Sequence, residues 1–400
     1  MRTYYSLIIL SFLLVFSIEK TTGQVVINNA NLQNFSNTKI HIHGDVYLAA
    51  NSTILNENYI SINGNFINNS GDSALINVPT GIIEFSGDDQ FIGGTEITTF
   101  NNLHFSGTGI KTLEKDVYVR QILDINDREI ATLENKLYLL NTDVNSLITN
   151  EGFVSSIGDG RFSRNMESMD SYYFPLGSSD LTERYRPLEI TPSSNDFTTF
   201  EVRMVNNIPT DDGFDVNQKD NDVIDYVNED WYHLINQTEG NQAVSLLFFY
   251  DEAVDNDFDA IVQWQGVDGW KKTTTATQLQ NMPPMFSSLE IQNWADFSSE
   301  PFSLAYKIQE GEDPINSITN VLGNLIDVYP NPATEYLIIK SAENFVNSFL
   351  NIYDINGKEL KSMKLNGAEK SIQLSDFSKG VYLLTITNDK GVYNNKIVIQ

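Results

Sequence analysis

The sequence predicts an all-β protein that consists of a short N-terminal β-solenoid, a central Ig-like β-sandwich and a small C-terminal β-sandwich. A strand-like pattern recurs about every 20 residues in the first part of the chain. Longer strands with alternating apolar and polar residues follow it. No stretch combines helical periodicity with helix caps. These observations divide the chain into five predicted segments: a signal peptide at 1–23, solenoid repeats at 24–150, a β-sandwich at 151–308, a linker at 309–325 and a C-terminal domain at 326–400.

The N-terminal segment has the three parts of a secretory signal peptide. Met1 and Arg2 form a short basic region, an apolar run covers residues 7–18, and small residues precede a predicted cleavage between Gly23 and Gln24. The alternative, a transmembrane anchor, requires about 20 apolar residues, and this run is shorter. No later segment is long and apolar enough to span, so we expect no transmembrane segment after signal cleavage.

The solenoid prediction rests on a five-residue unit in which two apolar residues alternate with polar ones before a glycine or aspartate. It occurs at residues 40–44, 60–64, 83–87, 103–107 and 123–127, and an irregular last member is expected at 137–141. Successive coils would stack the first and third residues of each unit in two inward columns. One column would hold Ile40, Ile60, Ile83, Leu103 and Leu123. An antiparallel meander is the alternative architecture.

Composition excludes several classes of chemistry and of partner. The chain contains no cysteine, so it has neither disulfides nor thiolate metal ligands. Its net charge is −28, and segment 1–23 contributes +1 and segment 326–400 contributes zero, so residues 24–325 have a net charge of −29. Such a body repels nucleic acid and anionic membranes, and we expect no nucleic-acid partner.

Acidic clusters in the sandwich offer weak candidates for calcium ligands. Oxygen ligands from closely spaced aspartates suit calcium, although neither cluster completes an EF-hand loop. The candidates are Asp220, Asp222, Asp225, Asp255, Asp257 and Asp259. Solvated acidic loops are the simpler interpretation, and we expect no other metal or cofactor. His41 and His43 lie two apart on one strand, as a zinc-binding pair would, but a polar solvent face is the simpler interpretation.

Catalytic motifs are missing from the sequence. It contains no nucleophile elbow, no phosphate-binding loop and no zinc-protease motif, so we expect a protein that is not an enzyme. Four tryptophans all lie in the sandwich. Trp270 follows a glycine in a predicted hairpin tip, where an exposed ring could stack on sugars, although packing in the core is the simpler interpretation.

The C-terminal segment carries a specific set of landmarks. It opens on Tyr329-Pro330-Asn331-Pro332, continues to a hairpin that ends in Gly357-Lys358, and reaches a Gly380-Val381-Tyr382 strand. Its last strand contains Lys396. We predict about seven short strands, with Tyr329 and Tyr382 in the core and positive φ at Gly380. The order and spacing of these pieces resemble the type A C-terminal sorting domain of the type IX (Por) secretion system of the Bacteroidetes.

This resemblance implies a route and a set of partners. The route is export through the signal peptide, followed by translocation across the outer membrane to the cell surface or the extracellular space. The partners are the type IX secretion machinery and its sortase-like peptidase, together with surface glycolipid or extracellular glycans. The cargo is expected to be a structural or adhesin-like protein. A carbohydrate-binding surface protein is the alternative, and a polysaccharide-active hydrolase is the least favoured function.

Overall fold

The computed structural model describes residues 23–155, 158–255, 257–273, 277–279, 287–307, 326–353, 358–375, 377–388 and 391–400. The chain forms two compact units, residues 1–308 and residues 309–400, and each is described by itself. The predicted linker at 309–325 lies outside the described residues. Within the described ranges, none of the helices has the length and apolar character needed to cross a membrane.

The first face of the solenoid is a six-stranded parallel sheet that confirms the predicted repeat. Its strands, in order along the sheet, are β3 (Lys39–Ile42), β6 (Tyr59–Ile62), β8 (Ile82–Phe85), β11 (Asn102–Phe105), β14 (Leu123–Asn126) and β17 (Leu147–Thr149). The register aligns Ile40 with Ile60 and Ile60 with Ile83, so the predicted column exists. Because neighbouring strands are parallel, the antiparallel meander is wrong.

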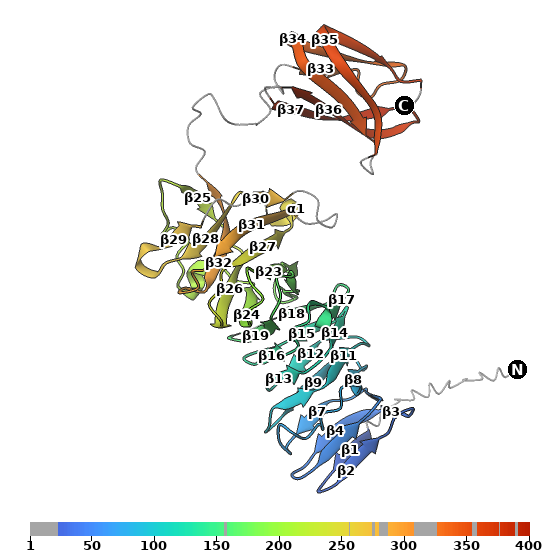
Figure 1. Cartoon of the computed structure of the whole chain (residues 1–400), viewed down its shortest axis with the longest axis vertical. Coiled ribbons are helices and arrows are strands. Elements are labelled where there is room, and N and C mark those ends of the chain that lie inside the picture. The colour runs from blue at the N-terminus through green and yellow to red at the C-terminus, as the bar shows by residue number, and fades with distance from the viewer. Residues whose placement is uncertain are drawn as a thin grey trace, which may run out of the picture. The chain divides into compact units, whose positions relative to one another are not determined.

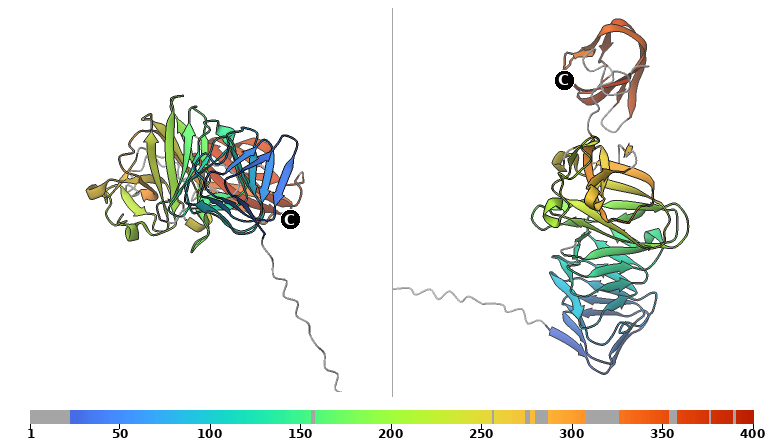
Figure 2. Two further views of the ribbon diagram at one scale, coloured as in Figure 1. Left: turned by 90° about the horizontal axis from the view of Figure 1, so that it is seen from below. Right: turned by 90° about the vertical axis from the view of Figure 1, so that its left-hand side faces the viewer.

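The remaining coil strands form the other faces of the solenoid, and the coils follow one another as rungs in Figure 2. A seven-stranded parallel sheet contains β1 (Gly23–Ile27), β4 (Gly44–Leu48), β7 (Phe66–Asn68), β9 (Gln90–Gly94), β12 (Lys111–Leu113), β15 (Glu129–Ala131) and β18 (Phe153–Ser155). A two-stranded sheet pairs β2 (Asn31–Asn34) with β5 (Thr53–Asn56). Another face begins with β10 (Thr98–Phe100), β13 (Val117–Val119) and β16 (Lys136–Leu139).

One expected repeat member is misplaced. The segment 137–141 was predicted to continue the first face, yet β16 lies in a different sheet, and β17 is the strand that pairs with β14. The alternating pattern of Leu137, Tyr138 and Leu139 does not distinguish one face of a solenoid from another, because every inward strand has the same period of two. The polar column His41, Ser61, Glu84, His104 and Asp124 is in the predicted register on the outer side.

Aromatic rings and asparagines fill and close the coils. Phe85 packs against Phe66, Phe100 and Phe105 with ring centroids 5.8–6.3 Å apart, and all four rings are buried. The buried side-chain amide of Asn56 donates to the carbonyl of Ile82 at 2.8 Å. Asparagines therefore satisfy backbone groups at the corners, where the ladder hydrogen bonds end.

A single ten-stranded sheet runs from the solenoid into the sandwich (Figure 1). β19 (Arg161–Met166) is parallel to β16 of the solenoid and antiparallel to β24 (Thr198–Val205). The sheet continues through β26 (Tyr232–Glu239), β32 (Pro301–Lys307), β28 (Ala260–Trp264) and β29 (Trp270–Lys272), and β25 (Ile224–Val227) also pairs with β32. The two predicted regions thus share continuous backbone hydrogen bonding.

A second, antiparallel sheet completes the sandwich and confirms the expected long strands. It contains β20 (Tyr172–Phe174), β23 (Leu188–Pro192), β27 (Val244–Tyr250), β31 (Ser287–Trp294) and β30 (Thr277–Leu279). The smaller elements are β21 (Gly177–Ser178) paired with β22 (Arg184–Tyr185), the short helical segments η1 (Val144–Ser146), η2 (Pro209–Asp212) and η3 (Gly266–Asp268), and the single turn α1 (Glu252–Asp255).

The described residues of the C-terminal unit form a nearly closed antiparallel sheet with five strands, where about seven short strands were predicted. They are β33 (Ile326–Tyr329), β34 (Tyr336–Tyr353), β35 (Glu359–Gln373), β36 (Gly380–Asn388) and β37 (Gly391–Ile399). The pairing of β34 with β35 shifts register between Lys340 and Phe345 and again before Ser348. Such bulges interrupt the alternation of a long strand, so each long strand resembles two short ones in the sequence.

Candidate functional site

The opening loop of the C-terminal unit is tied to its last strand through Asn331. The Asn331 side-chain amide donates to the carbonyl of Lys396 at 2.8 Å, and its Oδ1 accepts from the backbone N–H of Val398 at 2.9 Å. Ala333 continues the contact, because its N–H donates to the Val398 carbonyl at 2.8 Å. The two ends of the predicted sorting motif therefore meet in space, and Asn331 mimics a strand residue where Pro330 and Pro332 cannot donate.

The two tyrosines expected in the core behave differently. Tyr382 is 8% exposed, packs edge-on against Phe377 at 5.5 Å and donates its hydroxyl to the Ser378 carbonyl at 2.6 Å. Tyr329 is 41% exposed, so its prediction as a core residue is wrong. Strand β33 alternates, and burial of Ile326 places Tyr329 on the opposite, solvent-facing side.

The other sorting residues lie at the surface or outside the described residues. Gly380 begins β36 and is not among the glycines with positive φ, so that expectation is wrong. Lys358 and Lys396 are exposed. Gly357 lies outside the described residues.

The predicted cleavage point lies at the start of the first strand. Gly23 and Gln24 are exposed residues of β1 and pair with Gly44 and Asp45 of β4. Residues 1–22 lie outside the described residues. Cleavage between Gly23 and Gln24 remains a prediction, and it would leave most of β1 in place.

The six calcium candidates do not come together in a common site within the described residues. Asp220 forms an ion pair with Lys271, and Asp259 forms one with Lys307, each at 3.6 Å. Asp257 accepts from the hydroxyl of Tyr250 at 3.2 Å. Within the described ranges, no group of three or more acidic or histidine side chains is arranged to hold a metal ion. The remaining candidates are Asp222, whose N–H donates to Asp220, the exposed Asp225, and the buried Asp255.

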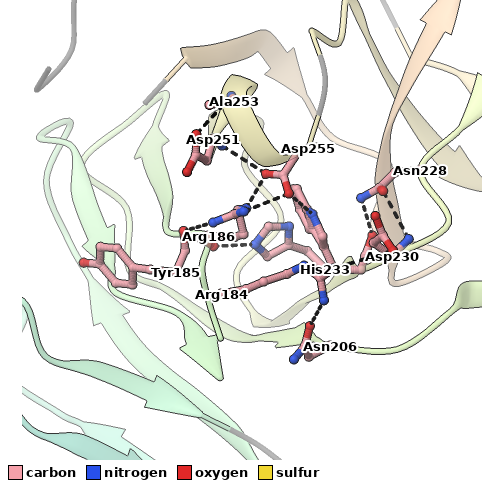
Figure 3. Close-up of polar contacts among 11 residues, drawn as sticks. Arg184, Tyr185, Arg186, Asn206, Asn228, Asp230, His233, Asp251, Ala253 and Asp255 are labelled. Atoms are coloured by element: carbon pink, nitrogen blue, oxygen red, sulfur yellow. Dashed lines mark hydrogen bonds and ion pairs between the residues drawn. The ribbon is translucent and has the colours of Figure 1, made fainter. Parts of the chain in front are cut away.

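Asp255 of α1 is instead half of a buried ion pair with Arg186, which lies two residues before β23 (Figure 3). It is 2% exposed, and its partner Arg186 is 4% exposed. Arg186 Nη2 donates to Asp255 Oδ1 at 2.7 Å, and Arg186 Nε contacts Asp255 Oδ2. The carboxylate also accepts from Trp231 Nε1 at 3.2 Å and from the N–H of Asp251 at 3.0 Å. Both charges are therefore compensated, as burial requires.

His233 lies beside this pair and is held neutral. Its ring packs against Trp231 at 5.4 Å, and its Nε2–H donates to the carbonyl of Arg186 at 2.9 Å. Burial, opposed by this hydrogen bond and reinforced by the charge of Arg186, lowers the pKa of His233 to about 4. The cluster anchors helix α1 and β26 to the segment around Arg186, and it is a stabilising core feature.

His233 gives the body a predicted pH dependence of stability. Its folded pKa of about 4 is below the unfolded value of about 6.5, so its contribution is complete above pH 6.5 and is lost as the pH falls toward 4. The gap corresponds to about 3 kcal/mol. We expect His233→Gln, which can still donate to the carbonyl, to lose less stability than the wild type between about pH 7 and about pH 5.

Urea unfolding followed by tryptophan fluorescence measures this difference, because all four tryptophans belong to the first unit. His41→Gln, at an exposed position of the solenoid, is the matched control and should retain the wild-type pH dependence. Equal pH dependence in wild type and His233→Gln would show that His233 does not couple stability to protonation.

Trp270 is not available as a sugar platform. It is fully buried, its ring lies 5.6 Å from Trp264 and 6.5 Å from Phe214, and its Nε1 donates to the Phe214 carbonyl at 3.3 Å. The hairpin between β28 and β29 folds this residue back onto the sheet. The possible stacking role considered from the sequence is wrong.

Comparison with known families agrees with the geometry of the C-terminal unit. Residues 327–400 match the family described as the secretion system C-terminal sorting domain. The match begins within β33 and ends at the last residue, so it contains the Asn331–Lys396 contact. Comparison with curated proteins finds no match to the chain.

Proposed function

We propose that this protein, which carries a type IX secretion C-terminal sorting domain and is exported to the cell surface or extracellular space, works there as a structural, adhesin-like binding protein. In this proposal the C-terminal domain delivers the chain by engaging the secretion machinery and its sortase-like peptidase. The first unit performs the extracellular role without catalysis.

The continuous ten-stranded sheet is the observation that carries this proposal. Strands β10, β13 and β16 belong to solenoid coils, and β24, β26 and β32 belong to the sandwich. Bending between the two regions would break the ladder between β16 and β19 at four register pairs. Shared backbone pairing therefore makes the solenoid a stiff support that presents the sandwich, which is a useful property for a surface adhesin.

Attachment of living cells tests the adhesive role. We expect cells that lack the chain to attach more weakly to glycan-coated or matrix-coated surfaces than wild-type cells do. Restoring the full chain should restore attachment, whereas a version without residues 326–400 should not. Unchanged attachment after removal of the chain would contradict the adhesive role and leave export unaffected.

A further inference from the structure

A row of three cations crosses the shared sheet where the solenoid joins the sandwich. Lys136 of β16 is in register with Arg161 of β19. Arg161 is adjacent to Arg203 of β24, one position beyond the pair Phe162 and Val202. Arg203 in turn faces Leu234 of β26, and the four strands lie side by side in Figure 1. Like charges at neighbouring positions on one face of a sheet repel one another, so the row needs compensation.

Two of these cations have an acidic partner and the third does not. Lys136 pairs with Glu201 at 2.8 Å, and Arg161 pairs with Glu300 at 2.8 Å. Within the described part of the chain, the Arg203 guanidinium has no ion pair or hydrogen bond, and its Nε is buried without a partner. Burial first, and then the charge of Arg161, lowers the pKa of Arg203, and the charges of Asp159 and Asp212 oppose this shift. These carboxylates attract the guanidinium without forming an ion pair with it, so its N–H groups stay available to donate to an anionic group of a ligand.

Arg203 lines a groove of about 530 Å³, which is large enough for a sugar residue and exceeds the size of a simple anion. Phe214 forms part of one wall, and its ring is fixed edge-on against Tyr232 at 5.5 Å. Tyr232 donates its hydroxyl to Asp212 at 2.9 Å, which holds that carboxylate at the groove. Ser298 also lines the groove.

These features differ in what they recognise. The guanidinium fork suits a carboxylate, which it can bind through two parallel hydrogen bonds. Asp212 and Ser298 can accept hydrogen bonds from hydroxyl groups, and the Phe214 ring offers an apolar surface to the face of a sugar. The acidic body, with a net charge of −28 for the whole chain, repels a densely charged polyanion and favours a ligand with a single carboxylate.

We propose that the Arg203 groove binds one carboxylate-bearing sugar of an extracellular glycan. Arg203 binds the carboxylate, while Asp212 and Ser298 bind sugar hydroxyls. This inference rests on the proposed binding function and assigns it a site and a ligand class. The site is independent of Trp270 and of the calcium candidates.

The test is calorimetric titration of the mature full chain with oligosaccharides that carry one uronic or sialic acid. Each is compared with its carboxyl-reduced, neutral form and with an acidic peptide. We expect the chain to bind an acidic oligosaccharide. Its affinity for the neutral form of the same oligosaccharide should be weaker by about tenfold or more. Arg203→Gln should weaken binding of the acidic form by about tenfold or more. Arg128→Gln, which removes a solenoid arginine that pairs with Asp127, is the charge-matched control and should bind normally.

A second variant keeps the test valid if Arg203→Gln destabilises the fold. Ser298→Trp fills the groove from an exposed position and should also abolish binding. No binding across the panel, equal binding of acidic and neutral forms, preference for the acidic peptide, or unchanged affinity in both variants would overturn the proposal. If cells need the chain for attachment although the chain binds none of these sugars, the adhesive function is supported and the sugar-binding groove is contradicted. If the chain binds a sugar through Arg203 but cells that lack the chain attach normally, the groove is supported and the adhesive function is contradicted.

Discussion

Removal of residues 326–400 is expected to abolish delivery to the cell surface, with the truncated chain accumulating in the periplasm. The predicted signal peptide is retained and should still direct the first step of export, whereas the matched sorting domain, which the outer-membrane step is expected to need, is missing. Residues 1–308 form a compact unit of their own, so truncation leaves their internal contacts in place. Fractionation of cells, followed by immunodetection of the periplasmic, surface and extracellular fractions, measures the outcome.

A reporter fusion tests the sorting domain separately from the rest of the protein. A reporter placed between the signal segment 1–23 and residues 326–400 should reach the surface or medium, and the same reporter without 326–400 should remain periplasmic. Asn331→Ala is a finer variant, because it removes two of the hydrogen bonds that join the opening loop to β37 and leaves those of the Ala333 backbone in place. Surface delivery of the truncated chain at the wild-type level would show that residues 326–400 do not direct the outer-membrane step.

The sequence predicted those features that depend on local repetition. The recurrence of an apolar pair every coil was sufficient to place Ile40, Ile60 and Ile83 in one column, because stacking of identical units fixes the register. The sorting domain was equally predictable, since its landmarks are short and ordered. The alternation of β33, however, puts Tyr329 outward, and the frequent core position of tyrosine gave the wrong expectation.

Features that depend on distant residues escaped prediction. Arg186 and Asp255 are 69 positions apart, and no local pattern distinguishes a buried aspartate from its exposed neighbours in the same acidic run. The Arg203 groove likewise joins three strands with the loop before β32, and it exists only once the register of the sheet is known. Single-sequence patterns report which face a residue occupies, but they do not report which residue lies opposite it.

Asp255→Ala is expected to destabilise the first unit by about 3–5 kcal/mol, because it leaves the Arg186 charge buried without its partner. The substitution also removes the acceptor for Trp231 Nε1 and for the N–H of Asp251, which frees helix α1 from the sheet. Urea unfolding at about pH 7, monitored by tryptophan fluorescence, measures the loss. Trp231 is a direct reporter, since its ring lies against both Arg186 and His233.

Asp220→Ala is the matched control, because it removes a carboxylate from the same acidic region whose ion pair with Lys271 is at the surface. Its cost should be below about 1 kcal/mol, since solvent screens an exposed pair. The double variant Arg186→Met with Asp255→Leu should recover much of the loss, because an apolar pair carries no buried charge. A cost for Asp255→Ala no larger than that for Asp220→Ala would mean that water reaches Arg186 and that the ion pair does not stabilise the first unit.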